Sequence, residues 1–369
     1  MTFTEFSTIE SLLRDTLCGG ITHHTAAGPG LARRSGKISG LGWHYLTPSD
    51  VARAPHEVFA ESWLREALIR LNPEIAEDED RADEVIHRLR AIILSVRSDG
   101  LIKANEELTA WLRGDRSMPF GPDHEHRTVR LIDFDNLDNN QYVVTNQFRI
   151  QAGPAERRAD LVLLVNGIPI VVIEAKTPVR QAVSWFDGAV QIHDDYERNV
   201  PELFVGNVLS VATEGKELRY GAVRMPVNLW GPWRTDDAPA VASLAAVETA
   251  ARGLLRPAVL LDILANFTMF ATDKGKRRIK IVCRYQQYDA ANQIVARVLA
   301  GQPRKGLIWH FQGSGKSLLM VFAAQKLRMQ PHCIGRADIV EVQPIGNRRH
   351  HHPVDDRGRL RRQAGRPGR

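Results

Sequence analysis

The sequence has few cysteines and no long apolar run. Its three cysteines, Cys18, Cys283 and Cys333, form an odd set without the spacing of a metal site. Such usage suits a reducing compartment rather than a disulfide framework. No apolar stretch reaches the roughly 18 residues of a membrane span, and the polar start of the chain lacks the charge and apolar core of a signal peptide. We therefore expect a soluble, cytoplasmic protein with no membrane partner.

Excess charge is also scarce outside the end of the chain. The formal net charge is +6, but residues 331–369 hold nine Arg against four Asp or Glu, so residues 1–330 carry only +1. A DNA-binding groove would therefore have to come from local basic patches. One cluster is a candidate, although an ordinary solvated face explains it equally well: Lys274, Lys276, Arg277, Arg278 and Lys280.

The most informative segment of the chain reads as a β-hairpin. Two apolar, β-branched runs, 161–165 and 170–173, flank the pair Asn166-Gly167. This pair is the strongest short-range hairpin signal, because both residues tolerate the positive φ angles of a tight turn. The pattern therefore predicts two antiparallel strands joined at residues 166 and 167.

The predicted hairpin brings Asp160 on the first strand near Glu174 on the second. Side chains alternate along a strand, so Glu174 and Lys176 point the same way while Ala175 points into the core. Two carboxylates suit Mg²⁺, and Lys176 would help to deprotonate its bound water or to stabilise charge on a phosphate. An isolated Glu-x-Lys is usually a solvated ion pair, but here it coincides with Asp160 and the hairpin. We therefore predict a Mg²⁺-dependent phosphodiesterase centre.

A second motif is typical of a phosphate-binding loop. Lys305–His310 predicts a short buried strand, Gly313-Ser314-Gly315-Lys316-Ser317 a glycine loop, and Leu318–Leu327 an apolar helix. In such a loop the backbone N–H groups face the nucleotide phosphates, Lys316 adds a positive charge and the Ser317 hydroxyl reaches Mg²⁺. The longer Gly-x-x-x-x-Gly-Lys-Ser pattern is not met, because position 310 is His, but the shorter form is common among helicase-type motors. We expect ATP to bind here.

A nuclease hairpin followed by a motor loop resembles the motor-and-nuclease (R) subunit of type I restriction enzymes, from about residue 5 to about residue 330. The resemblance implies a restriction-endonuclease-like, PD-(D/E)xK α/β core followed by the start of a RecA-like helicase domain. It also implies Mg²⁺ and ATP as cofactors, double-stranded DNA as substrate, and modification (methylase) and specificity subunits as partners. Recognition would belong to those partners, so the chain does not reveal which DNA sequence is recognised. The segments that carry the resemblance are Ile9–Arg14, Gly42–Tyr45, Glu61–Pro73, Asn139–Phe148, Asn166–Lys176, Gln191–Tyr196, Pro201–Phe204, Ala212–Gly215, Arg284–Gln287 and Trp309–Ser317.

The resemblance assigns roles in the nuclease centre residue by residue. The family's Asp and Glu-x-Lys map onto Asp160, Glu174 and Lys176, with the two carboxylates as the metal ligands. A glutamate on the first helix often assists in this family. Glu10 is the best match for it, Glu5 is an alternative, and a plain surface carboxylate remains an equal reading.

Two further contacts are implied by the same resemblance. The family's Gln-x-x-x-Tyr contact to DNA is matched by Gln191, but Tyr196 lies five residues later instead of four and is the weaker match. In related motors a glutamine upstream of the phosphate loop reads adenine. That residue would be Gln287 or Gln286, and the sequence leaves both open.

The chain divides into four expected segments: 1–215, a nuclease domain; 216–270, a linker and helical connector; 271–330, the beginning of a RecA-like motor domain; and 331–369, a basic tail. The tail has no Lys and no aromatic residue, and its scattered Arg, Gly, Pro and His cannot bury enough apolar surface to order it. We expect it to be disordered and to be the product of a shifted reading frame or a disrupted gene. A genuine basic DNA-binding tail is the alternative.

Two other function classes stay open. The chain could be a stand-alone Mg²⁺-dependent nuclease that needs neither ATP nor partners, or a catalytically inert remnant that docks to the methylase and specificity core. ATP hydrolysis by such motors also needs an acidic residue on a later strand and arginines from a second lobe. We therefore expect weak ATP binding without DNA-stimulated turnover.

Overall fold

The computed structural model describes residues 5–21, 37–176, 183–235, 237–239, 241–303 and 305–329. The fold is mixed α/β, and its centre is a seven-stranded sheet with the order β11-β10-β9-β8-β7-β6-β3. The pairs β3–β6 and β8–β9 are parallel and the other neighbours are antiparallel. The strands of this sheet are β3 (His44–Leu46), β6 (Tyr142–Ala152), β7 (Ala155–Val165), β8 (Ile168–Ala175), β9 (Leu209–Thr213), β10 (Leu218–Gly221) and β11 (Gly231–Pro232).

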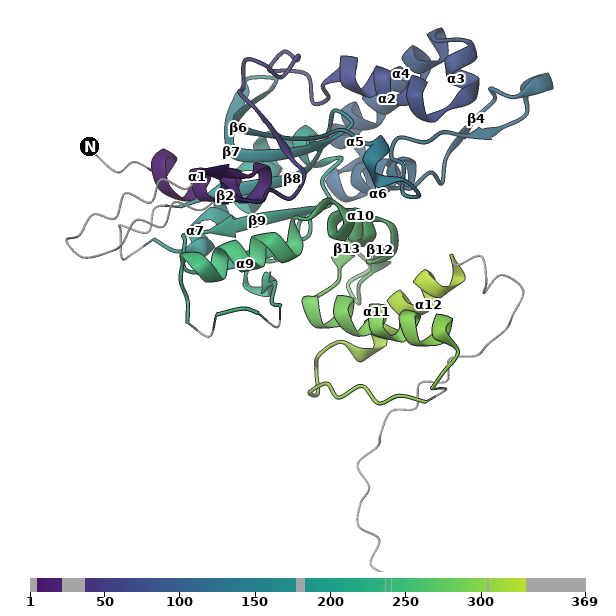
Figure 1. Ribbon diagram of the computed structural model, residues 1–369. Coiled ribbons are helices and arrows are strands. Elements are labelled where there is room, and N and C mark those ends of the chain that lie inside the picture. The colour runs from purple at the N-terminus through teal and green to yellow at the C-terminus, as the bar shows by residue number, and fades with distance from the viewer. Residues whose placement is uncertain are drawn as a thin grey trace, which may run out of the picture.

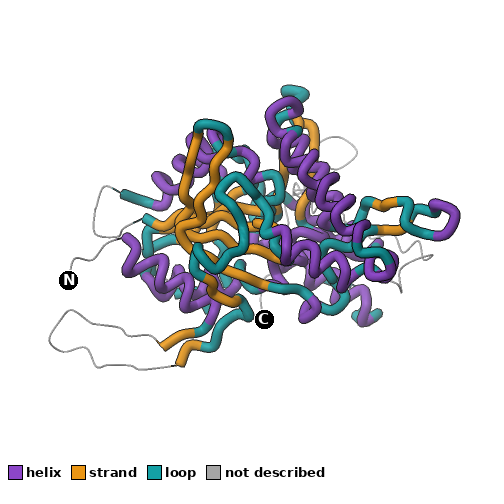
Figure 2. Tube along the Cα trace, turned by 90° about the horizontal axis from the view of Figure 1, so that it is seen from above, coloured by secondary structure: helices purple, strands orange, loops and turns teal. Residues whose placement is uncertain are grey.

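Helices surround this sheet, which occupies the middle of the molecule when it is viewed from above (Figure 2). Helices α1 and α7 contact its strands β6, β8 and β9, and α9 packs against α1 (Figure 1). The α-helices are α1 (Glu5–Cys18), α2 (Glu61–Leu71), α3 (Pro73–Glu77), α4 (Asp80–Leu94), α5 (Val96–Asp99), α6 (Leu101–Leu112), α7 (Trp185–Val190), α8 (Glu197–Asn199), α9 (Leu244–Leu254), α10 (Pro257–Asn266), α11 (Tyr285–Ala300) and α12 (Lys316–Arg328).

The remaining elements are short. A π-helix, η3 (Gln191–Tyr196), directly follows α7, and the 3₁₀ turns are η1 (Pro122–His124), η2 (Leu137–Asn139), η4 (Pro201–Phe204) and η5 (Val227–Leu229). Three two-stranded ladders stand outside the main sheet: β1 (Gly20–Ile21) with β2 (Lys37–Ile38), β4 (Ser117–Met118) with β5 (Arg127–Thr128), and β12 (Thr268–Thr272) with β13 (Arg278–Val282). No helix in the described part of the chain is long and apolar enough to cross a membrane.

The predicted hairpin is confirmed. Strands β7 and β8 pair antiparallel around Asn166 and Gly167, whose φ angles are +50° and +80°. Every residue of β8 is buried, as expected for a central strand with both faces covered. The turn is also tied to α2, because the backbone N–H of Ala60 donates to the carbonyl of Gly167 at 2.9 Å. The turn therefore fixes the register at the closed end of the hairpin, and the register shifts once further along, between Leu163 and Leu164.

The main sheet continues past the expected domain boundary at residue 215. Strands β10 and β11 follow that boundary and pair with β9 and with each other. Trp230 and Trp233, which the sequence placed in a linker, are buried in the hydrophobic core. The linker reading of this stretch is wrong, because the two indoles pack against the sheet instead of facing solvent. The helix-rich character expected for the rest of the connector is confirmed by α9 and α10.

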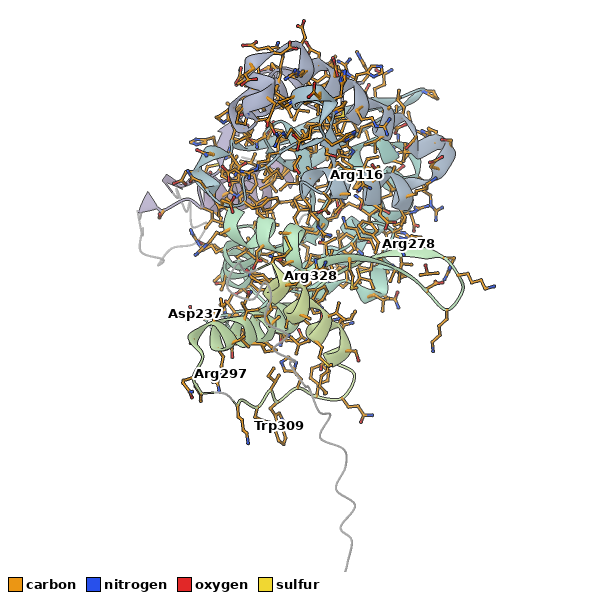
Figure 3. All side chains as sticks on the ribbon, turned by 90° about the vertical axis from the view of Figure 1, so that its right-hand side faces the viewer. Arg116, Asp237, Arg278, Arg297, Trp309 and Arg328 are labelled. Carbon is orange, nitrogen blue, oxygen red and sulfur yellow. The ribbon has the colours of Figure 1, made fainter. Side chains whose placement is uncertain are left out.

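The segment before the glycine loop differs from its prediction. Lys305–His310 is neither a strand nor buried, since Leu307 is 68% and Trp309 86% exposed. Figure 3 shows Trp309 at the end of the molecule remote from Arg116. A buried strand needs hydrogen-bonding neighbours, and no strand within the described ranges pairs with this segment. The helix after the loop is confirmed as α12, which packs against α11.

The basic cluster of residues 274–280 does not form one free surface. Lys280 is buried and donates to the carbonyl of Asn207, so it faces the interior instead of solvent. Arg277 pairs with Asp273, and Arg278 with Glu106. Burial removes Lys280 from the expected DNA-binding patch, and the ion pairs reduce the net charge that Arg277 and Arg278 present at the surface. The expected tail, 331–369, lies outside the described residues.

The turn at Gly167 yields a stability prediction. A Cβ at Gly167 would lie 2.4 Å from the carbonyl oxygen of Ala60, and φ is positive there. Gly167→Ala should therefore lower the free energy of unfolding by about 2–4 kcal/mol, from backbone strain and overpacking together. At Gly153 φ is also positive, but a Cβ would meet nothing within 4 Å. Gly153→Ala is the matched control and should lose only about 1–2 kcal/mol in urea denaturation. Equal losses would show that contact with α2 does not constrain the turn.

Candidate active site

The ladder register sets three polar residues in a row across the sheet. Pairs Asn146↔Leu161 and Phe148↔Ala159 put Gln147 of β6 level with Asp160 of β7. The pair Leu161↔Ile173 likewise puts Asp160 level with Glu174 of β8. Directly opposite residues project to the same face of a sheet. Asp160 is fixed in this row because its Oδ2 accepts the backbone N–H of Ala175 at 2.9 Å.

Glu174 is the electrostatic centre of the row. Its side chain is 3% exposed, Oε1 accepts a hydrogen bond from Lys176 Nζ at 2.9 Å, and Oε2 is buried without a hydrogen-bond partner among the described residues. Burial and the neighbouring Asp160 carboxylate raise the Glu174 pKa to about 8, against the opposing effect of Lys176. A buried carboxylate oxygen without a donor is unfavourable unless a cation or a proton reaches it.

The donor set fits Mg²⁺ bound by two protein carboxylates. Within the described ranges, no group of three or more His, Cys, Asp and Glu side chains forms a metal cage. Mg²⁺ does not need one, since it commonly keeps several waters and binds one or two carboxylates together with substrate phosphate. Asp160 and the unpartnered Oε2 of Glu174 supply such a pair. The cation would also remove the reason for Glu174 to hold a proton.

Lys176 joins the carboxylates to the helix that follows them. Its Nζ donates both to Glu174 Oε1 and to Gln191 Oε1, from the end of β8. Gln191 Nε2 in turn donates to the Tyr196 hydroxyl, and that hydroxyl donates to the carbonyl of Arg158 at 3.0 Å. The chain of hydrogen bonds thus links both strands of the hairpin through one helix.

The five-residue spacing of Gln191 and Tyr196 has a local structural explanation. Residues 191–196 form a π-helix, in which each turn contains one residue more than the hydrogen-bonded turn of an α-helix. Residues five apart therefore lie on the same face, and the two side chains meet although the sequence spacing differs from the family pattern. The structure brings both predicted residues to the row of Asp160 and Glu174, where Tyr196 is buried and its hydroxyl is bonded within the protein.

Glu10 also reaches the row, from α1. It is buried, and both of its carboxylate oxygens lie 3.3 Å from Gln147 Nε2. The side chain of the alternative, Glu5, lies outside the described residues. The sequence reasoning did not single out Gln147 as a candidate, although a polar Asn-Gln pair is unusual in the middle of an apolar strand.

The glycine loop leads directly into α12. Gly313 and Gly315 have φ of +85° and +81°, and Lys316 Nζ donates at 2.9 Å to the carbonyls of His310 and Phe311. The Lys316 ammonium is therefore bound to carbonyls of its own loop. A nucleotide phosphate would have to replace these carbonyls as its hydrogen-bond partner. Ser314 is buried, and Ser317 is exposed in the first turn of α12.

The two candidate glutamines differ in their contacts. Gln287 is buried; its Nε2 donates to the carbonyls of Ser314 and Gly315, and its Oε1 accepts the N–H of Arg284. Its amide is thus used within the protein to hold the glycine loop. Gln286 is half-buried, and its Oε1 is buried without a hydrogen-bond partner among the described residues.

The family described as "Type I restriction enzyme R protein N terminus" matches residues 36–228, which include the whole row of site residues on the sheet. The chain belongs to this family. Residues 286–342 match the family described as "SWI2/SNF2 ATPase", a range that contains the glycine loop and extends into the expected tail. The resemblance inferred from the sequence is confirmed.

Curated relatives carry the same family name. The Type I restriction enzyme HindI endonuclease subunit of Haemophilus influenzae is 31% identical over 320 residues, which cover 80% of this chain and 29% of that protein. The Putative type I restriction enzyme MjaVIIP endonuclease subunit of Methanocaldococcus jannaschii is 33% identical over 216 residues, covering 54% of this chain and 19% of that protein. The chain thus spans less than a third of the length of these relatives.

The raised pKa of Glu174 gives a pH-dependent stability prediction. Glu174 ionises near 4.5 in the unfolded chain and near 8 in the fold, so the folded state binds the extra proton between these values and loses stability as pH rises. In metal-free buffer at pH 8, Glu174→Gln should raise the free energy of unfolding by on the order of 1 kcal/mol. The free energy of unfolding of this variant should still depend on pH, because burial also raises the Glu197 pKa to about 8. The exposed control, Glu66→Gln, should follow the parent, and an unchanged profile for Glu174→Gln would contradict the assignment.

Proposed function

We propose that this chain carries the nuclease centre of a type I restriction enzyme R subunit, a Mg²⁺-dependent PD-(D/E)xK endonuclease that cleaves double-stranded DNA. The observation that supports it most is the row of Asp160 and Glu174 with Lys176 beside them, in a chain whose relatives are named endonuclease subunits. In the full complex, cleavage would be coupled to ATP-driven translocation through the motor that begins after residue 271. Modification and specificity subunits would supply the recognition of DNA.

The mechanism follows from the positions of the side chains. Asp160 and the Oε2 of Glu174 would hold Mg²⁺, which supplies an activated water and polarises the scissile phosphate. Lys176, held between Glu174 and Gln191, stands where its ammonium can stabilise charge that develops on the phosphate. Tyr196 and Gln191 fix this ammonium through their own hydrogen bond. The helix that carries them is therefore part of the catalytic geometry.

Two alternatives give different results in one experiment. Purified chain is mixed with modification and specificity subunits and unmodified plasmid, with and without ATP. A subunit of the complex cleaves only with partners, and a stand-alone nuclease nicks with Mg²⁺ alone. An inert remnant joins the complex and cuts nothing.

The role of Lys176 is open to a direct test. Lys176→Ala should reduce plasmid cleavage at least about a hundredfold, because the ammonium acts on charge that develops in the transition state. Binding of Mg²⁺ and of DNA should change little, since Lys176 is not a ligand. Lys103→Ala, an exposed lysine of α6, is the control and should cleave like the parent. If Asp160→Ala and Lys176→Ala both cleave like the parent, the site is assigned wrongly.

Nucleotide binding is expected to be weak in this chain. The segment before the loop, Lys305–Phe311, is exposed and unpaired among the described residues, so the loop is poorly preorganised for phosphate. A fluorescent ATP analogue should titrate with a dissociation constant of roughly 0.1 mM or weaker, and DNA should not stimulate hydrolysis. Lys316→Ala should weaken binding further, while the nearby control Lys305→Ala should not. A robust ATPase rate that Lys316→Ala removes would overturn this expectation.

A further inference from the structure

The backbone of Gln147 is strained at one position in an otherwise regular strand. Its φ is +48°, and among the described residues it is the one non-glycine with positive φ inside a strand. The neighbouring pairs Asn146↔Leu161 and Phe148↔Ala159 are intact, so the distortion is confined to the position level with Asp160. Side-chain-bearing residues avoid this region of φ, and such outliers cluster at functional sites.

The side chain of Gln147 makes a long-range contact. Its Nε2 donates to both carboxylate oxygens of Glu10, 137 residues earlier in the sequence, at 3.3 Å each. Glu10 is 5% exposed on a helix that packs against β6 and β8. A buried carboxylate is held in place by its hydrogen-bond donors. The amide therefore restrains a third carboxylate at the end of the row that contains Asp160 and Glu174.

We propose that Gln147 is a positioning residue, which holds the Glu10 carboxylate beside the Asp160–Glu174 pair so that it can order the water or metal ion bound there. This inference rests on the nuclease function proposed above. Glycine would adopt the same backbone conformation without strain. A side chain at a strained position, with its amide on a buried acid, points to a function that stability alone does not require.

The rival explanation is purely structural. In that case the amide only satisfies a buried carboxylate of the core, and its removal would lower the stability of the fold without a specific effect on the reaction. The two explanations differ for Gln147→Gly, which removes the amide and relieves the strain at once. If Gln147 positions Glu10, the Gln147→Gly variant should cleave DNA more slowly, while its free energy of unfolding stays equal to the parent's or rises. A structural role predicts less stability.

The experiment uses the full chain as parent, Gln147→Gly, Glu10→Gln and the double variant, with Gln151→Gly as control. Gln151 lies on the same strand but is exposed. Urea unfolding in metal-free buffer is measured first. Plasmid cleavage is then measured against Mg²⁺ and against DNA concentration, with the partner subunits if cleavage needs them. The unfolding midpoint against Mg²⁺ gives a readout independent of cleavage.

We expect Gln147→Gly to unfold at the parent's urea midpoint or above it. Its kcat should fall about tenfold with KM for DNA little changed, and its half-saturating Mg²⁺ concentration should rise. In the Glu10→Gln background the same change should have little further effect, because the carboxylate to be positioned is already gone. Gln151→Gly should leave kcat and the Mg²⁺ dependence unchanged.

Five results would count against these proposals in distinguishable ways. Positioning by Gln147 is refuted if Gln147→Gly cleaves with the parent's kcat and Mg²⁺ dependence or unfolds below the parent's urea midpoint. It is also refuted if Glu10→Gln is fully active, or if the two changes reduce kcat additively. The nuclease function then still stands. A parent chain that neither cleaves DNA with its partners nor shows a Mg²⁺-dependent midpoint refutes the nuclease function, and the positioning role with it.

Discussion

The register of the β7–β8 hairpin is the constraint on which the site depends. Side chains on a strand alternate between faces, so a slip of one residue would turn Asp160 and Glu174 to opposite sides of the sheet. The turn at Asn166 and Gly167 closes the hairpin with positive φ angles and is held against α2 by a backbone hydrogen bond. A shift of one residue between Leu163 and Leu164 then brings Asp160 level with Glu174. The turn and this irregularity together determine the position of the pair.

Burial gives the same pair its chemistry. Glu174 lies in a central strand whose every residue is buried, and the only cation that contacts it among the described residues is Lys176. One ammonium does not balance two carboxylates, so the folded protein favours a proton or a metal ion on Glu174. The hydrogen bonds that run from Lys176 through Gln191 to Tyr196 limit where that ammonium can move. The charge imbalance and the hydrogen-bonded network together favour a cation at the proposed site.

The sequence predicted the parts of the molecule that local rules govern. The Asn-Gly turn, its flanking strands and the apolar helix after the glycine loop follow from conformational preference and periodicity, and the structure has all three. Predictions that depended on distant partners were less accurate. Burial of Lys305–His310 required neighbouring strands, and exposure of Lys280 required that nothing pack over it. The contact between Gln147 and Glu10 joins segments far apart in sequence, and no pattern in either one indicates it.

The π-helix at residues 191–196 has a consequence for how this family is compared. A π-turn is what an α-helix becomes when one residue is inserted and both flanks keep their original contacts. Here the flanks are Gln191, bound to Lys176, and Tyr196, bound to the Arg158 carbonyl. An alignment that permits no gap inside a helix would place His193 to Tyr196 one position out of step with a relative that has the shorter spacing. Superposition on the hydrogen bonds, instead of on the sequence, would restore the correspondence, and the length of this helix could vary among relatives while the site stays the same.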